Sequence, residues 1–249
     1  MHRFYLPPER CAGEMLRLDG REAHHALNVL RLKHGELVAV LDGIGNEFMC
    51  TVADCGRNAV TLSVSLKNFV PAVPCAVTLL QAVPKGKIIE TIIQKSVELG
   101  ARRVVPILSE RVVTQLDDDD AENKRDKWQN VAIEAIKQCG AAWLPKIEAP
   151  MTIEQFLARK EKFDLSLIGS LQKERRHPRE ILREFEAKQK RLPQNVGVWI
   201  GPEGDFTLEE LRAIQNSGAL PISLGNLVLR VETAAIYCLS ILSYELQRD

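Results

Sequence analysis

Two prolines close together divide this chain into parts with different sequence periodicity. Pro71 and Pro74 lie three positions apart, and proline can continue neither a central strand nor the interior of a helix. Short apolar runs typical of β-strands come before this point, and strands that alternate with helices follow it. We therefore place a domain junction here and predict two domains, residues 1–70 and 74–249.

The first part has the pattern of a small β-barrel. Its apolar runs are short and are separated by turn residues, of which Asp42-Gly43-Ile44-Gly45-Asn46 is typical of a hairpin. One stretch, from about His24 to Arg31, instead has apolar residues at helical spacing, which leaves His24, His25 and Arg31 partly toward solvent. The predicted strands are Arg3 to Leu6, Leu37 to Leu41, Phe48 to Ala53 and Val60 to Leu66.

The second part alternates strands with helices, which predicts an α/β domain with a mostly parallel sheet and helices on its faces. The predicted strands are Ala76 to Val83, Val104 to Leu108, Asp164 to Gly169, Val196 to Ile200 and Leu220 to Leu224. The predicted helices are Lys87 to Leu99, Ala121 to Gln138, Arg179 to Lys190, Leu208 to Ser217 and Glu232 to Leu246.

Composition narrows the classes of protein that fit. The 249 residues include 33 Lys+Arg and 33 Asp+Glu, so any RNA contact must come from a local positive patch. Six cysteines are scattered without a C-x-x-C pair, which predicts no metal site and favours free thiols in a reducing cytosol. The most apolar stretch, Ala234 to Leu242, is about half the roughly 20 residues that a membrane-spanning helix needs. The amino terminus lacks the apolar region of a secretory signal, so we expect a cytoplasmic protein with no membrane partner.

Three unusual turns follow predicted strands of the second part. They are Ile168 to Leu171, Trp199 to Phe206 with the sequence G-P-E-G inside it, and Leu224 to Ala234. Ligands of open α/β sheets bind beyond the carboxyl ends of the strands, and glycine there lets backbone groups approach a ligand closely. None of these turns has the pattern of a dinucleotide-binding or nucleoside-triphosphate-binding loop. G-P-E-G alone fits an ordinary tight turn, and its pairing with L-G-x-x-x-L-R-x-E-T-A favours a binding site.

Taken together, these motifs resemble those of the SPOUT-class RNA methyltransferases of the RsmE type. The resemblance also includes Arg3-Phe4 near the amino terminus and H-H-x-x-x-V-L-R-x-x-x-G from His24 to Gly35. A further motif, P-K-G-x-x-x-x-x-x-I-Q-K-x-x-E-L-G, runs from Pro84 to Gly100. The resemblance covers almost the whole chain.

The resemblance implies a PUA-like β-barrel that binds RNA, joined to a SPOUT α/β domain with a trefoil knot. It implies S-adenosylmethionine as the methyl donor and a homodimer. The implied substrate is N3 of a uridine in 16S ribosomal RNA, either free or within the assembled small ribosomal subunit. The chain departs from the family pattern at Ala141-Ala142, where an arginine is common, and at Asp205, where glycine is usual.

The turns and the resemblance together give candidate site residues. Arg230 is a candidate catalytic residue because a guanidinium near the uracil carbonyl oxygens would stabilise the N3 anion, and Glu232 is the second candidate. An ion pair between Arg230 and Glu232 or another carboxylate is the alternative. The candidate cofactor-binding residues are Leu167, Ile168, Gly169, Ser170, Ile200, Gly201, Pro202, Glu203, Gly204, Leu224, Gly225, Asn226, Val228 and Leu229. The candidate RNA-binding residues, expected along a groove between the two domains, are Arg3, His24, His25, Arg31, Lys85 and Lys87.

Some alternatives stay open at the level of sequence. His24 and His25 also fit a helix start with one buried imidazole. A SPOUT methyltransferase that acts on another RNA, such as tRNA, would have the same motifs. A non-catalytic RNA-binding factor for ribosome assembly is suggested by Ala141-Ala142 in place of the family arginine. Binding of S-adenosylmethionine would separate an enzyme from such a factor, and mapping of modified nucleosides would identify the RNA.

Overall fold

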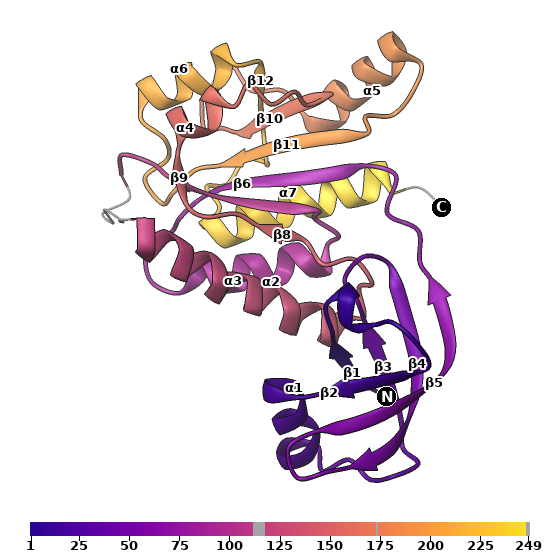
Figure 1. Ribbon diagram of the computed structural model, residues 1–249. Helices are drawn as coiled ribbons and strands as arrows, with labels where there is room; N and C mark the ends of the chain where they lie inside the picture. Colours follow the sequence, from indigo (N-terminus) through magenta and orange to yellow (C-terminus); the bar gives the residue numbers. More distant parts are fainter. Residues whose placement is uncertain (112–117, 173, 248–249) are drawn as a thin grey trace. The chain divides into compact units, whose positions relative to one another are not determined.

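The computed structural model describes residues 1–111, 118–172 and 174–247, and the chain divides into two compact units (Figure 1). One unit comprises Met1–Ala72 with Ile133–Leu144, and the other comprises Val73–Ala132 with Pro145–Asp249. The division falls at the proline junction for the first part of the chain. Residues 133–144 group with the first unit, although the sequence pattern assigned them to the second domain.

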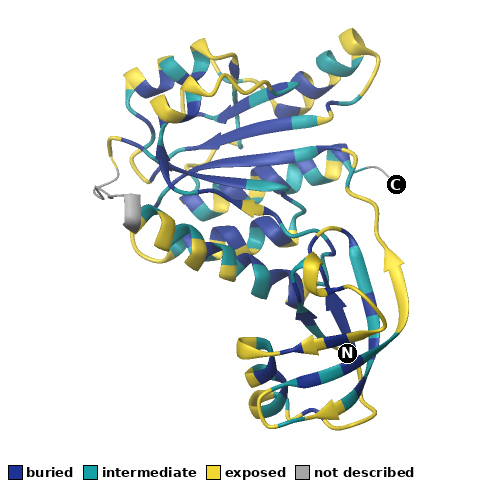
Figure 2. Cartoon of the chain, in the orientation of Figure 1, coloured by how far each residue is buried: buried dark blue, intermediate teal, exposed yellow. Residues whose placement is uncertain are grey.

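The first unit is a curled sheet of five strands around an apolar core (Figures 1 and 2). The strand order is β1-β3-β4-β5-β2; β1 and β3 pair in parallel, and the other neighbours pair antiparallel. The sequence pattern missed β2 because this strand is short and stands among charged residues. The strands are β1 (His2–Tyr5), β2 (Met15–Leu18), β3 (Leu37–Leu41), β4 (Asn46–Cys55) and β5 (Val60–Phe69).

The helical segment of the first unit begins earlier than the sequence pattern predicted. After a short 3-10 turn (Pro8–Arg10), it consists of α1 (Gly20–His24) and a π-helical turn (His25–Val29). His24 is exposed, whereas His25 is partly buried and its ring packs edge-on against Phe4, with the ring centroids 6.1 Å apart. One histidine of the pair therefore contributes to packing and the other faces solvent.

The predicted hairpin turn between β3 and β4 is organised by Asp42. The Asp42 carboxylate accepts hydrogen bonds from the backbone N–H groups of Ile44 and Asn46, at 2.9 and 3.0 Å. Asp42 is itself buried, so these backbone donors replace the water that would otherwise solvate its charge. The turn is held in one conformation as a result.

This turn also explains why residues 133–144 belong to the first unit. Gly45 donates its N–H to the carbonyl of Ala142 at 3.0 Å, and its own carbonyl accepts from the N–H of Val70 at 2.8 Å. The indole N–H of Trp143 donates to the carbonyl of Val70 at 2.9 Å. These bonds join segments that are distant in sequence, so a pattern of local periodicity could not reveal them.

A buried ion pair attaches the end of α3 (Asp118–Cys139) to the same unit. The ammonium of Lys137 lies 2.8 Å from the Glu22 carboxylate and 3.0 Å from that of Glu134. Arg3 donates to the carbonyl of Gln138, at 3.3 Å, near the carboxyl end of the helix. A cation there interacts favourably with the helix dipole.

The second unit contains a seven-stranded sheet in which every described pair is parallel, as the α/β prediction required. The order is β12-β10-β11-β6-β7-β8, and β9 pairs with β7. The adjacent positions of β10, β11 and β12 bring their carboxyl ends together. The strands are β6 (Ala76–Ala82), β7 (Arg103–Leu108), β8 (Lys146–Ile147), β9 (Met151–Thr152), β10 (Leu165–Gly169), β11 (Asn195–Ile200) and β12 (Ala219–Ile222).

Helices cover both faces of this sheet. On one face, α4 (Ile153–Ala158) and α6 (Leu208–Asn216) enclose an apolar core that includes Trp199. On the other, α2 (Ile88–Glu98) and α7 (Val231–Leu246) pack against each other and α7 contacts β6 and β11. A further helix, α5 (Pro178–Gln189), is joined to α7 by an ion pair between Arg179 and Glu245 at 2.9 Å. The buried positions follow the sheet and the inner sides of these helices (Figure 2).

A capping box precedes α6. Thr207 accepts from the N–H of Glu210 at 3.2 Å, and the Glu210 carboxylate accepts from the N–H of Thr207 at 2.7 Å. The second oxygen of Glu210 accepts from the N–H of Glu110 at 2.8 Å. Glu210 therefore fixes the start of α6 to the loop that follows β7, and with it the turn after β11.

Within the described residues, no helix is long and apolar enough to cross a membrane. The same residues contain no cluster of histidine, cysteine, aspartate and glutamate suited to a metal ion. The six cysteines are free thiols, four of them buried. Burial raises the pKa of the Cys238 thiol to about 12 and therefore keeps it protonated.

Candidate functional site

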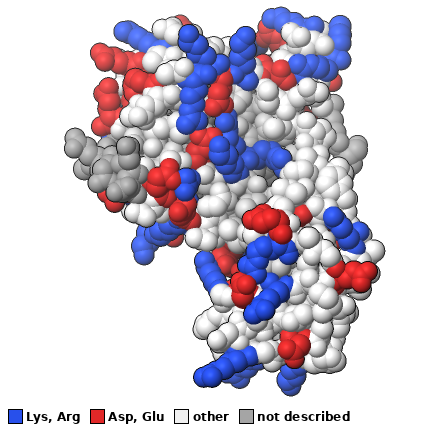
Figure 3. Space-filling view, viewed as in Figure 1, with Lys and Arg blue, Asp and Glu red and all other residues white. Residues whose placement is uncertain are grey.

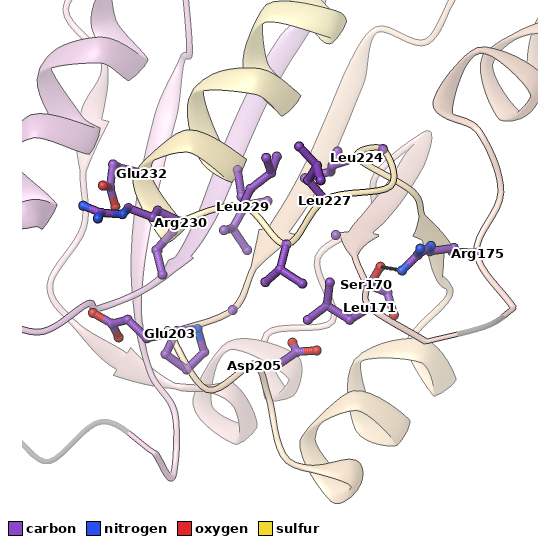
Figure 4. A pocket seen from close by; sticks show the side chains of 18 of the residues that line it. Ser170, Leu171, Arg175, Glu203, Asp205, Leu224, Leu227, Leu229, Arg230 and Glu232 are labelled. Carbon is purple, nitrogen blue, oxygen red and sulfur yellow. Dashed lines mark hydrogen bonds between the residues drawn. The ribbon is translucent and has the colours of Figure 1, made fainter.

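The three glycine-bearing turns meet at one cavity of about 470 Å³ in the second unit (Figure 4). The turns follow β10, β11 and β12, which are neighbours in the sheet. Parallel strands end at the same edge, so segments far apart in sequence come together there. This edge is the expected position of a ligand site in an open α/β sheet.

Most of the candidate ligand-binding and catalytic residues line this cavity. Leu167 and Ile168 do not, because they are fully buried strand residues, and Gly204 and Asn226 belong to the turns but lie outside the lining. Side chains at Leu167 and Ile168 are therefore unavailable to a ligand. The lining candidates are Gly169, Ser170, Ile200, Gly201, Pro202, Glu203, Leu224, Gly225, Val228, Leu229, Arg230 and Glu232.

The cavity has an apolar middle, where Leu224, Leu227 and Leu229 gather, and polar side chains on either side (Figure 4). Acidic side chains outnumber basic ones in the lining, three to two. The polar side chains are Glu203, Arg230 and Glu232 on one side and Ser170, Arg175 and Asp205 on the other.

Arg230 occupies the N-cap position of α7 without capping it through its side chain. In the part of the chain that the structure describes, its guanidinium forms no hydrogen bond or ion pair, so the alternative of a pair with Glu232 is not realised. Arg230 is exposed and lines the cavity. Its guanidinium donors are therefore available to a ligand.

Glu203 joins two of the motifs. Its carboxylate accepts a hydrogen bond from the backbone N–H of Lys85 at 3.0 Å. Lys85 lies in the turn that follows β6, within the P-K-G motif, and Glu203 lies in the turn that follows β11. The bond holds these two turns side by side at the edge of the sheet.

Asp205, where the family pattern has glycine, has a left-handed backbone with φ of 60°. Its carboxylate accepts from the N–H of Phe206 at 2.8 Å and lines the cavity. Burial raises the pKa of Asp205 above its usual value, although the Phe206 bond and the Arg111 charge act in the opposite direction. The ionised carboxylate is therefore held at a cost to the folded state.

We expect Asp205→Asn to raise the melting temperature at about pH 7 and to lose this gain as the pH falls to about 3. Asparagine keeps the side-chain shape, tolerates left-handed φ and still accepts from the Phe206 N–H, but it removes the charge. Because the folded pKa is raised, ionisation lowers the free energy of unfolding at high pH, and the penalty vanishes once both states are protonated. Thermal unfolding followed by circular dichroism measures the difference. An equal gain at both pH values would contradict this account.

The candidate RNA-binding residues fall in both units. His24 and Arg31 are exposed, and Arg31 has a left-handed φ of 54°. Arg3 already donates to the carbonyl of Gln138, so its guanidinium has a structural role. Lys85 and Lys87 are exposed in the second unit.

Several lining residues were not among the candidates. Arg175 lies beyond the first predicted turn, Ile168 to Leu171, but it lines the cavity and donates to the carbonyl of Ser170 at 3.4 Å. Ile88, from the start of α2, gave no signal in the sequence because it follows the helical period of that segment. Leu227, Val231 and Ala234 lie within the third predicted turn, Leu224 to Ala234, but were not chosen as candidates there. Ala141 and Ala142 are not in the lining.

Comparison with known families agrees with this fold and site. A profile for an RNA methyltransferase domain matches residues 71–243, and one for an RNA methyltransferase PUA domain matches residues 18–65. A parallel α/β sheet with a cavity at its carboxyl edge, preceded by a PUA domain, defines the chain as an RNA methyltransferase of the SPOUT class.

Similar proteins narrow this class. Ribosomal RNA small subunit methyltransferase E of Bacillus subtilis is 31% identical over 92% of this chain and 89% of that protein. The protein of the same name from Synechocystis is 32% identical over 96% of this chain and 76% of that protein. The chain therefore belongs to the ribosomal RNA small subunit methyltransferase E family, which confirms the resemblance of its motifs.

Solved structures show the same architecture. A protein from Legionella pneumophila solved with its cofactor S-adenosylmethionine has a TM-score of 0.87 and 33% identity, covering 98% of this chain and 97% of that one. Ribosomal RNA small subunit methyltransferase E from Neisseria gonorrhoeae, bound to S-adenosylmethionine, has a TM-score of 0.86 and 25% identity, and the match covers 98% of each chain.

Proposed function

We propose that this protein uses S-adenosylmethionine to methylate N3 of a uridine in 16S ribosomal RNA of the small subunit. The observation that carries the proposal is the meeting of the three glycine-bearing turns at one cavity, with the exposed guanidinium of Arg230, which has no partner among the described residues, in its lining. Membership of the family supports an RNA substrate.

The residues of the cavity fit S-adenosylmethionine. A volume of about 470 Å³ lies within the usual range for small-molecule sites, and the apolar middle suits a nucleoside base. The cofactor carries a sulfonium and an ammonium against one carboxylate, which matches an acidic excess in the lining. When bound, it supplies an electrophilic methyl group. The residues that would hold it are Gly169, Ser170, Ile200, Gly201, Pro202, Leu224, Gly225, Val228 and Leu229.

Arg230 is the proposed catalytic residue. Uridine N3 bears a proton at neutral pH, so the nucleophile needs an anionic nitrogen, whose charge spreads onto the neighbouring carbonyl oxygens. The guanidinium of Arg230 would donate to those oxygens and so stabilise the anion. Glu232, in the first turn of α7, lines the same cavity and is the second proposed catalytic residue.

His24, Arg31, Lys85 and Lys87 are the proposed RNA contacts, with Arg3 and the half-buried His25 in supporting positions. Cations of this kind bind phosphate and give an affinity that falls with salt. The exposed positions of His24, Arg31, Lys85 and Lys87 support the proposal.

We also propose a homodimer, a trefoil knot in the α/β domain and a cytoplasmic location. Support for the homodimer comes from exposed apolar side chains in the segment before α7 and on that helix, namely Leu227, Val228, Tyr237 and Tyr244. Leu239 and Leu242 are buried within the second unit and are unavailable for this interface. Light scattering would give the mass of a dimer, and a monomer mass at micromolar concentration would exclude it.

Transfer of a tritiated methyl group from S-adenosylmethionine to small ribosomal subunits tests the function. We expect the purified protein to label 16S RNA of subunits from a strain that lacks the gene, and nucleoside mapping to identify N3-methyluridine. Free 16S RNA and tRNA serve as competing substrates. Transfer to tRNA alone would redirect the proposal to another RNA, and the absence of cofactor binding would favour a non-catalytic factor.

A further inference from the structure

Glu203 lines a second cavity besides the cofactor cavity. This second cavity measures about 280 Å³ and lies wholly within the second unit. Its wall comes from the turn after β6, the start of α2 and the part of α3 that includes the buried Trp128. We name it the lysine cavity.

The lysine cavity carries an excess of positive charge. Two acidic residues, Glu90 and Glu203, face five basic ones in its lining: Lys85, Lys87, Arg111, Lys124 and Lys127. The neighbouring cofactor cavity has an acidic excess, and the chain as a whole has a formal net charge of zero. On the face drawn in Figure 3, acidic and basic side chains are interspersed, so a one-sided group of this kind is a local feature.

Three of these cations have no partner among the described residues. Lys127 pairs with Glu90 at 2.7 Å, and Arg111 donates to the carbonyls of Gly204 and Asp205. The ammonium groups of Lys85, Lys87 and Lys124 form no described hydrogen bond or ion pair. Like charges in excess of the nearby counter-charges repel one another, and an anion placed among them would relieve this repulsion.

We propose that the lysine cavity binds a backbone phosphate of the RNA strand next to the nucleotide that is methylated. The inference rests on the proposed function. It adds Lys124 and Arg111, which come from segments distant in the sequence, to the proposed RNA contacts of the P-K-G turn. Glu203 lines both cavities, so a phosphate held here adjoins the cofactor site. Phosphate contacts carry no sequence information, but they fix the register of the strand, which would bring one base to Arg230.

The double variant Lys87→Gln/Lys124→Gln tests the phosphate site. We expect roughly tenfold weaker binding of a 16S RNA fragment and a salt slope, log Kd against log salt concentration, lower by about 1.4. Fluorescence anisotropy measures both, and calorimetry should give unchanged affinity for S-adenosylmethionine. Lys188→Gln/Lys190→Gln removes the same two charges from the exposed end of α5 and is the matched control. An unchanged salt slope in the double variant would overturn the inference.

The variant Glu90→Gln should change the affinity for RNA in the opposite direction. A misfolded protein would not bind RNA more tightly, so misfolding cannot produce this result. This change removes one acidic group and releases Lys127, so we expect RNA binding to tighten by about threefold and the salt slope to increase. Binding that is unchanged or weaker would count against the site. The assay does not require turnover. Failure of methyl transfer by the wild type would overturn the proposed function, whereas normal salt slopes in both variants would overturn only the phosphate site.

Discussion

Arg230→Ala is expected to lower methyl transfer to small ribosomal subunits by about a hundredfold to a thousandfold, with S-adenosylmethionine binding retained within about twofold. The guanidinium has no partner within the described part of the chain, so its removal leaves no buried group unpaired and should not unfold the protein. Its loss would remove donors that act on charge developing at the uracil oxygens. Single-turnover transfer of a tritiated methyl group measures the effect.

The pH dependence of the variant separates this role from simple cofactor binding. Uridine N3 loses its proton unaided in alkaline solution, so the rate of Arg230→Ala should rise more steeply with pH than that of the wild type. Arg212→Ala removes an exposed arginine from α6 and is the matched control. A variant with wild-type rate, or one that loses cofactor binding in parallel with rate, would refute the assignment.

Gly45→Ala is expected to destabilise the first unit by about 4 kcal/mol, at the upper end of single-residue effects. A Cβ at this position would lie 2.8 Å from ring carbons of both Phe69 and Trp143 and 2.9 Å from the carbonyl oxygen of Val70. The residue also has a φ of 102°, which non-glycine residues rarely adopt. Urea unfolding followed by tryptophan fluorescence, which includes Trp143, measures the loss.

Gly13→Ala separates crowding from backbone strain. Gly13 has a φ of 93°, but a Cβ there would meet no atom within 4 Å. We expect a loss of about 1 kcal/mol from the backbone conformation alone. If both alanine variants lost the same stability, the contacts of Gly45 with the segment around Trp143 would be unimportant and the description of that turn would be wrong.

The sequence predicts most elements of both units because the apolar residues within each element follow the pattern of either a strand or a helix. Leu37–Leu41 and the helix after Thr207 were predicted to within a residue, since a short apolar run in the first and the capping box of Thr207 and Glu210 in the second are local signals. The two-residue strands β8 and β9 and the short helix α4 carry too few residues for a period. The π-helical turn at His25 has no sequence signature at all.

The location of the cavity could be predicted from the sequence, but the residues that line it could be predicted only in part. Alternation of strands and helices predicts a parallel sheet whose strands all end at one edge, so the turns after β10, β11 and β12 could be expected there, although the strand order could not. Which residues of a turn face a ligand depends on the last paired residue of the strand, and this is why Ile168 is buried while Gly169 lines the cavity. Arg175 lines the cavity although it lies beyond the turn that follows β10. The tertiary structure determines this position, and no local pattern in the sequence indicates it.

A single helix, α3, starts in one folding unit and finishes in the other. The amino-terminal segment therefore obtains part of its packing, including Trp143 and the carbonyl of Ala142, from residues made long after the proline junction. Expression of residues 1–70 alone would leave that surface uncovered. Residues 133–144 therefore complete the packing of the first unit, and synthesis on the ribosome must pass well beyond the junction before that packing is complete.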